Sequence, residues 1–594
     1  MKKPRSCPIC LSFCLFLALL PALSALALGC AGHASSSSGQ AVDDDNDDND
    51  NDVLPDDDAS PDDDASPDDD ASPDDDASPA DDDSWVDILP HSTPPDQLYV
   101  LDISGLDLPT QVLAASLQGL VARTKPEIYL LNLWSGAPPN LPGTDAFLEF
   151  YKARHGVTTI AATDVWQLVD QFADRYAGAV VYDPNLPDTL DVATTIAGLD
   201  GLLIVHPDLL AEAEAHGVAL TQDLRGKWTD KDAAYDWAVA NLLPACSPLA
   251  VADLDATTLG PRDYLVQNRI FTFRYQPIAG EFDRLMNVLR LYPKNLPVMG
   301  YLSTGGDEEG LGEIELALAN AFLLPSDYAP NLSTHSGIQV APAAFTQPAV
   351  EPPNLTPQQI GDAVFVSFAV SDGDNYQLPL HWLLRMWADP ARGQVPISWT
   401  IPGMLSLLAP GVAEYYFANR TDLDRFLTVC GVGYVYASLY PDKSRLIELS
   451  SHYVRRLDLD GIWLLDPVMD AQLPALFGGY LDDLAVAAGL RGFVANYSRE
   501  FKNHDFTAGD APILYTMIDY GSGDPAADMT QTINQAISQK TAGSPAYVFF
   551  GVSAWTVTPT EMLAALNAFQ DNENVHAVSV SQMLDLMKSY PPGW

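Results

Sequence analysis

The stretch that decides the fold is Val364-Phe365-Val366-Ser367-Phe368-Ala369-Val370, followed directly by Ser371-Asp372-Gly373-Asp374-Asn375-Tyr376. Its apolar, β-branched and aromatic residues predict a buried strand, and the Asp-Gly pair predicts a turn where the strand ends. Seven or eight strand and helix units of this kind in residues 346–594 predict a (β/α) barrel-like C-terminal domain, with an open doubly wound sheet as the alternative. The further strand-like segments are 397–401, 433–437, 461–465, 492–496, 513–518, 546–550 and 575–580.

The same alternation continues upstream over residues 96–345. The segment Gln97–Asp102 has the composition of a strand, 112–122 has helical spacing, and more strand-like segments follow. This βα rhythm predicts an N-terminal α/β domain with mainly parallel strands. Five prolines between Pro342 and Pro357 predict an extended connector between the two domains.

The first 95 residues have the features of an exported lipoprotein. A basic start, an apolar run and Ala27-Leu28-Gly29-Cys30 predict a signal peptide over 1–30 and lipidation at Cys30, with a single transmembrane anchor as the alternative. Residues 31–95 are rich in Ser, Asp and Pro, which predicts a disordered acidic linker. We therefore expect a lipid-anchored protein of the cell envelope, at the outer membrane or cell surface, that contacts the membrane only through its lipid.

Charge and cysteine content restrict the partners. The formal net charge is −50, and 22 aspartates lie within 43–83, so residues 84–594 still carry about −31. This surplus of negative charge argues against nucleic acid as a partner, because phosphate binding needs a basic surface. Beyond Cys30, only Cys246 and Cys430 remain, either free or paired, so stability must come mainly from burial.

The candidate catalytic residues lie where barrel strands should end, since parallel barrels carry their active sites at the carboxyl ends of the strands. Asp372 and Asp374 follow the first strand, and Asp466 follows Gly461–Leu465. Paired carboxyl groups can act as acid and base, or as acid and nucleophile, in glycoside hydrolysis. The alternative for 371–375 is an Asx-type turn that only joins strand and helix.

Aromatic and amide side chains near other strand ends favour a carbohydrate ligand, because sugar rings stack on aromatic faces while their hydroxyls bond to polar groups. Each aromatic residue could instead belong to the core. Glu308 and Glu309 lie in a glycine-flanked acidic segment that could close over the barrel mouth, or could simply favour the dipole of a following helix. The predicted substrate contacts are Asn375, Trp399, Tyr434, Tyr436, Asn496, Trp555, Glu308 and Glu309.

Other chemistries lack their signatures. No two of the ten histidines are three or four residues apart, and the chain contains no H-E-x-x-H, G-x-S-x-G or G-x-x-x-x-G-K-[ST] motif. We therefore expect neither a metal nor a cofactor. A metal-dependent deacetylase or other esterase would need metal ligands that we cannot assemble from the sequence.

The segment Gly431-Val432-Gly433-Tyr434-Val435-Tyr436-Ala437 resembles the signature of the GxGYxYP family, which is classed with the glycoside hydrolases; Ala437 replaces the family's proline. The resemblance extends to 330–335, 371–375 and 398–402, and covers 96–594. It implies a carbohydrate substrate and the family's N- and C-terminal domains. We expect a surface-tethered glycoside hydrolase acting on an extracytoplasmic polysaccharide or oligosaccharide, with a non-catalytic carbohydrate-binding lipoprotein as the alternative.

Overall fold

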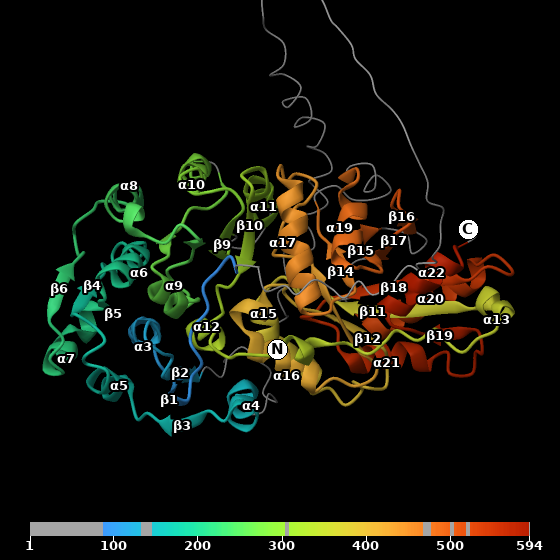
Figure 1. The fold of residues 1–594 in the computed structure, drawn as a ribbon, viewed down its shortest axis with the longest axis horizontal. Coiled ribbons are helices and arrows are strands. Elements are labelled where there is room, and N and C mark those ends of the chain that lie inside the picture. The colour runs from blue at the N-terminus through green and yellow to red at the C-terminus, as the bar shows by residue number, and fades with distance from the viewer. Residues whose placement is uncertain are drawn as a thin grey trace, which may run out of the picture. The chain divides into compact units, whose positions relative to one another are not determined.

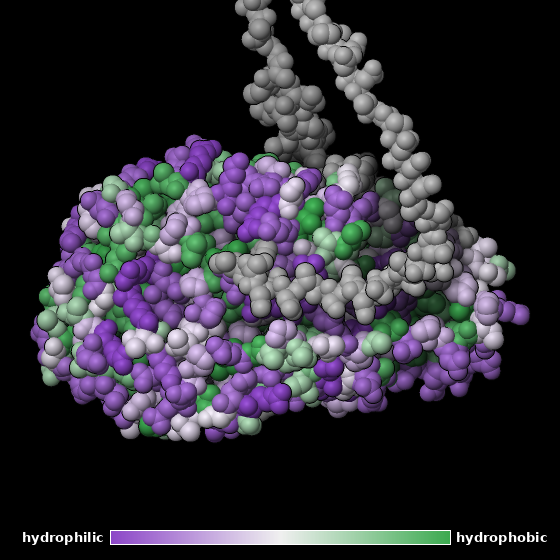
Figure 2. Space-filling view, in the orientation of Figure 1, coloured by the Kyte–Doolittle hydropathy of each residue, from purple (hydrophilic) through white to green (hydrophobic). Residues whose placement is uncertain are grey.

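The computed structural model describes residues 87–131, 145–278, 280–302, 308–466, 477–498, 504–517 and 523–592. The predicted signal peptide, Cys30 and most of the acidic linker lie outside them. From Ile88 onward the chain forms one compact unit, and Figure 1 labels most of its elements. In the described ranges, no helix combines the length and apolarity needed to cross a membrane. Hydrophilic residues cover most of the face drawn in Figure 2, with hydrophobic residues scattered among them.

Three small parallel sheets form the N-terminal part, blue to green in Figure 1. We call the surrounding segments the first lobe (97–171), the second lobe (179–245) and the third lobe (251–335). The sequence predicted one α/β domain here; the structure has three separate sheets because their strands, three to six residues long, pair only within their own lobe. The strands are β1 (Gln97–Asp102), β2 (Ile128–Leu131) and β3 (Thr158–Ala161); β4 (Ala179–Val181), β5 (Leu203–Val205) and β6 (Leu220–Asp223); β7 (Val251–Asp253), β8 (Phe271–Phe273), β9 (Leu296–Gly300) and β10 (Ala321–Pro325).

Buried helices hold the three lobes together. Asp107 caps α3 (Leu108–Ala122) by accepting from the Thr110 N–H at 3.0 Å, as an N-cap carboxylate does, and α3 is buried from Val112 onward. The Asp191 carboxylate on α6 (Thr189–Asp200) accepts two bonds of 3.2 Å from Arg262 on α9 (Arg262–Asn268). Both side chains are fully buried, so this pair fixes the second lobe against the third. The other helices of these lobes are α4 (Ala146–His155), α5 (Val165–Gln171), α7 (Leu210–Ala215), α8 (Lys231–Asn241), α10 (Phe282–Leu289), α11 (Glu308–Leu318) and α12 (Leu332–His335).

The C-terminal part is a barrel-like sheet, yellow to red in Figure 1. Its strands are parallel except for β16 (His504–Phe506), which runs antiparallel to β17. Because β11 pairs with both β18 and β12, seven strands form a ring. This arrangement agrees with the predicted barrel-like sheet and not with an open one. The ring contains β11 (Val364–Val370), β12 (Ile397–Thr400), β13 (Asp424–Val429), β14 (Gly461–Leu464), β15 (Gly492–Ser498), β17 (Pro512–Met517) and β18 (Ala546–Val552), and β19 (Val575–Ala577) pairs with the start of β11.

Helices follow most of the barrel strands. Several begin with a proline in the first turn after a Thr or Asp cap, the arrangement that local propensity favours. The helix α13 (Pro357–Asp362) precedes β11. The helices after the strands are η4 (Leu378–Trp382), α14 (Leu383–Trp387), α15 (Leu405–Leu408), α16 (Pro410–Ala418), α17 (Lys443–Arg456), α19 (Tyr480–Ala488), α20 (Pro525–Gln539), α21 (Pro559–Asn567) and α22 (Val580–Ser589).

One predicted strand was wrong. The sequence placed a strand at 433–437, but the strand is β13, at Asp424–Val429. Two charged residues open β13, and they are buried because each has a partner: Asp424 pairs with Arg392 at 2.6 Å and Arg425 with Asp460 at 3.2 Å. The glycine-rich segment 431–437 is the loop that follows.

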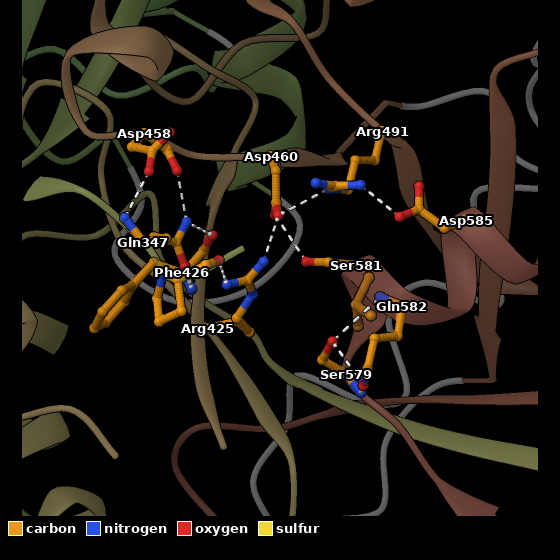
Figure 3. A network of polar contacts seen from close by, with 12 residues as sticks. Gln347, Arg425, Phe426, Asp458, Asp460, Arg491, Ser579, Ser581, Gln582 and Asp585 are labelled. Atoms are coloured by element: carbon orange, nitrogen blue, oxygen red, sulfur yellow. Dashed lines mark hydrogen bonds and ion pairs between the residues drawn. The ribbon is translucent and has the colours of Figure 1, made fainter. Parts of the chain in front are cut away.

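Ionic contacts close the end of the barrel where the strands begin (Figure 3). Asp460, just before β14, lies 3.2 Å from Arg425 and 3.3 Å from Arg491, and accepts from the Ser581 hydroxyl of α22 at 2.8 Å. Arg491 also contacts Asp585. Because this end is filled by mutually satisfied charges, a ligand site of the barrel should lie at the opposite, carboxyl end of the strands.

Candidate active site

The loop after β11 makes a sharp turn at the carboxyl end of the barrel. The Ser371 N–H donates to the Val552 carbonyl at 2.9 Å, and Asp372 takes a φ of +65°, a conformation rare for non-glycine residues and often found at functional sites. At Gly373, an added Cβ would lie 2.3 Å from Thr400, so only glycine fits there. The turn therefore sets Asp372 and Asp374 at the strand end, as the sequence predicted.

Asn375 has a structural role in this turn. Its side-chain oxygen accepts from the Gln377 N–H at 2.8 Å, and its own N–H donates to the Asp372 carbonyl at 3.1 Å. This is the Asx-type arrangement considered as the alternative. The next residue, Tyr376, donates its N–H to the Pro325 carbonyl at 2.9 Å. The end of β11 thus borders the end of β10 in the third lobe.

The third lobe contributes two further carboxyl groups through α11. The sequence placed Glu308 and Glu309 before a helix, but α11 begins at Glu308. Glu309 therefore lies in its first turn, and Glu313 lies one turn later on the same face. The Tyr301 hydroxyl, just after β9, donates to Glu309 at 2.6 Å. Glu313 is only 1% exposed, and neither of its carboxyl oxygens has a hydrogen-bond partner among the described residues.

Electrostatic coupling joins these acids to the barrel. Burial, together with the charges of Asp372 and Glu309, raises the pKa of Asp374 to about 8. Burial, together with Glu309 and Asp374, raises the pKa of Glu313 well above its ordinary value. Asp374 should therefore hold a proton at neutral pH, and the pKa of Glu313 is shifted in the same direction. A protonated carboxyl beside other carboxylates is the pattern of an acid paired with a base or nucleophile.

The segment 431–437 connects the barrel to the third lobe. Tyr434 and Leu323 of β10 form an antiparallel bridge, with N–H to carbonyl distances of 2.9 and 3.0 Å. An added Cβ on Gly433 would lie 2.8 Å from the Leu323 carbonyl, so this close approach explains the second glycine of the motif. The buried hydroxyls of Tyr434 and Tyr436 lie 3.4 Å apart, and Tyr436 borders Gly310 of α11. The motif therefore lies beside the acidic groups.

Asp466 lies just after the end of β14, where the sequence placed it, and binds the loop that follows the motif. It is buried at the end of β14, and its two carboxylate oxygens accept from the Ser438 N–H at 3.0 Å and the Ser438 hydroxyl at 2.6 Å. The carboxylates that raise the pKa of Asp374 are Asp372 and Glu309. The bonds to Ser438 hold the turn after the motif. The pairing of Asp466 with Asp372 and Asp374 stays a prediction, and Glu309 is a further carboxylate that acts on Asp374.

The predicted aromatic contacts divide into core and surface residues. Trp399 is completely buried and donates its indole N–H to Asp424 at 2.8 Å, so its prediction as a substrate contact was wrong: β12 turns this side chain into the core. Trp555 is partly exposed beyond the end of β18. The side chains of Asn496 in β15 and Glu308 in α11 lie outside the described part of the chain, and their roles stay predictions.

Sequence reasoning missed Tyr301 and Glu313, although the spacing of Glu309 and Glu313 could have indicated a shared helix face. Cys430 is buried, and Asp374 and Glu313 act electrostatically on its thiol, whose pKa burial raises. Cys430 and Cys246 form no disulfide. Within the described ranges, no group of three or more His, Cys, Asp or Glu side chains is arranged to hold a metal ion.

Comparison with known proteins agrees with this layout. Residues 362–588 match the family model "GxGYxYP putative glycoside hydrolase C-terminal domain", and 97–174, 176–246 and 251–337 match the family's first, second and third N-terminal domains. A crystal structure of a "putative hydrolase" from Bacteroides thetaiotaomicron has a TM-score of 0.73 and 22% identity, covering 86% of this chain and 98% of that chain, which shows a shared fold.

A second crystal structure, of a "probable Polysaccharide deacetylase" from Pseudomonas aeruginosa, has a TM-score of only 0.29 and 12% identity, covering 40% of this chain and 95% of that chain. This similarity is too low to support an inference. No protein with a curated description matches the chain.

Proposed function

The chain belongs to the GxGYxYP family, and from this premise we propose that it hydrolyses glycosidic bonds of an extracytoplasmic polysaccharide or oligosaccharide, with Asp374 as the general acid. The observation that carries the proposal is the grouping of Asp372, Asp374 and Glu309 at the carboxyl end of β11, where burial and the two neighbouring carboxylates raise the pKa of Asp374 to about 8. A glycosidase needs one carboxyl that is still protonated near neutral pH and a second that is ionised.

The roles follow from this division. Asp374 donates its proton to the glycosidic oxygen as the bond to the leaving sugar breaks. Asp372 supplies the ionised carboxylate, as the base toward water in an inverting reaction or as the nucleophile in a retaining one. Glu309, held by the Tyr301 hydroxyl at 2.6 Å, adds negative charge that keeps Asp374 protonated and stabilises the positive charge that develops on the sugar.

The experiment uses the full chain purified in mild detergent and incubated with laminarin, xylan, galactomannan, amylose and chitosan, with reducing-end release as the readout. We expect hydrolysis of at least one of these, and a loss of at least ~100-fold in kcat/KM for Asp374→Asn and Asp372→Asn. Asp510→Asn is the matched control, because Asp510 is exposed and has the same φ of +65° as Asp372. Full activity in both site variants would refute the roles, and binding without hydrolysis would favour a carbohydrate-binding protein.

A further inference from the structure

Two tryptophans lie side by side beyond the ends of β11 and β18. Trp382 is the last residue of η4, and Trp555 lies three residues after β18. Their ring centroids are 5.2 Å apart, and both side chains are partly exposed. Because β11 and β18 pair up to Val370 and Val552, Trp555 lies at the same edge of the barrel as Asp372.

The surroundings fix the orientation of this pair. The Trp382 indole N–H donates to the Ala554 carbonyl at 2.7 Å, which ties Trp382 to the residue immediately before Trp555. The Ala554 N–H donates to the Ser371 hydroxyl at 3.4 Å, one residue before Asp372. The Arg385 guanidinium lies over the Trp382 ring at 5.2 Å from its centroid. Trp555 therefore packs at a tilt of 50° against a tryptophan that hydrogen bonds connect, through Ala554 and Ser371, to the turn bearing Asp372 and Asp374.

Exposure distinguishes this pair from the other barrel tryptophans. Trp387 and Trp399 contact each other in the core and are 6% and 0% exposed. A partly exposed indole whose orientation is fixed before binding loses little conformational entropy when a ligand stacks on it. The apolar C–H face of a pyranose ring is the chemical partner that suits such a surface. The negative charges of Asp372 and Glu309 would repel an anionic sugar, so an uncharged ring suits this edge best.

We propose that Trp555 is the stacking platform of a sugar subsite beside Asp372 and Asp374, and that Trp382 and Arg385 are positioning residues that hold its ring. The subsite takes a neutral pyranose unit of the glycan. Its identification as a sugar subsite rests on the proposed function, but its occupancy can be measured without turnover.

The chain offers a matched control. Trp228 and Trp237 in the second lobe form another pair with centroids 5.2 Å apart at 50°, the same separation and angle as Trp382 and Trp555, and both are also partly exposed. They belong to α8 and the loop before it, away from the barrel strands. If the loss of any partly exposed tryptophan weakened glycan binding, substitutions in both pairs would weaken it. If Trp555 forms a subsite, only substitutions in its own pair should do so.

Binding is measured in full-length Asp374→Asn protein by affinity electrophoresis in gels containing each of the five polysaccharides. We expect retardation by at least one of them, and Trp555→Ala should weaken it about five- to tenfold. Trp382→Ala should weaken it less, and Trp382→Phe, which keeps the ring, should recover part of the loss. Trp228→Ala and Trp237→Ala should bind like the parent. In the active protein, Trp555→Ala should raise KM with little change in kcat.

The possible outcomes separate the two proposals. Trp555-dependent binding by a wild-type protein that hydrolyses nothing would support the subsite and remove the hydrolase. Hydrolysis with an unchanged KM in Trp555→Ala would support the hydrolase and overturn the subsite. Equal losses in Trp228→Ala and Trp555→Ala, or the absence of Trp555-dependent retardation in all five gels, would also overturn the subsite.

Discussion

At the scale of single residues, the activity should depend on Asp374, a carboxyl group that its neighbours keep protonated. Asp374 must be protonated to act as an acid, so kcat/KM should fall as the pH rises through its pKa of about 8. Glu309→Gln removes one of the charges that raise this pKa while keeping an acceptor for Tyr301. The alkaline limb of the pH profile should therefore move to lower pH by ~0.5 to 1 unit.

The control for this shift is Glu315→Gln on the same helix. Glu315 is partly buried, and Arg290 is the charged group that acts on it, so its removal should leave the pH profile unchanged. An identical alkaline limb in wild type and Glu309→Gln would contradict the assignment of Asp374 as the acid that Glu309 influences.

Glu313 supports a separate prediction about stability. Its pKa is raised in the folded protein by burial and by Glu309 and Asp374, so the folded state binds more protons than the unfolded state above pH ~4.5. Its contribution to stability is present at low pH and is lost as the pH rises through the folded pKa. Glu313→Gln stays neutral at both pH values. The thermal midpoint of this variant minus that of wild type should therefore be ~2 °C more positive at pH 9 than at pH 5. Differential scanning calorimetry at the two pH values tests this, and a shift that is the same at both would contradict it.

At the scale of elements, local pattern identified β11 and its acidic turn, because apolar runs and Asp-Gly pairs report on local conformation. It misplaced β13, because the charges of Asp424 and Arg425 resemble a loop until their distant partners are known. The site was only partly predictable, because local sequence pattern does not report contacts between distant segments. Asp372 and Asp374 follow a strand in sequence, whereas Glu313 and Tyr301 join them only through contacts between the third lobe and the barrel.

The element that makes this connection is the loop 431–437. Gly433→Ala would place a methyl group 2.8 Å from the Leu323 carbonyl, so the bridge between Tyr434 and β10 must shift. We expect a loss of about 1–3 kcal/mol in the free energy of unfolding, together with a lower kcat because α11 carries Glu309 against the barrel. Chemical denaturation and steady-state kinetics give the two quantities. Gly105→Ala is the control, since an added Cβ there has nothing within 4 Å; equal effects in both variants would count against the bridge.

At the scale of the whole molecule, charge sets which glycans can reach the site. Residues 84–594 carry a net charge of about −31, and the carboxylates of Asp372 and Glu309 act together on Asp374 at the end of β11. A polyanionic glycan approaching this surface meets like charge, which lowers its association rate and its affinity. The neutral substrate class therefore agrees with the local argument from the aromatic platform and with the charge of the chain as a whole.

The same scale includes the predicted attachment to the cell envelope. We propose that Cys30 is lipidated and that the acidic segment after it separates the globular unit from the membrane; 65 residues could span at most ~230 Å when fully extended. Cys30→Ser should abolish detergent-phase partitioning, because lipid is the proposed membrane contact, while the reducing-end release from a soluble oligosaccharide stays at the wild-type rate. Phase separation in detergent and the same activity assay measure both properties. Unchanged partitioning of Cys30→Ser would instead indicate that the apolar N-terminal segment is retained as a membrane anchor.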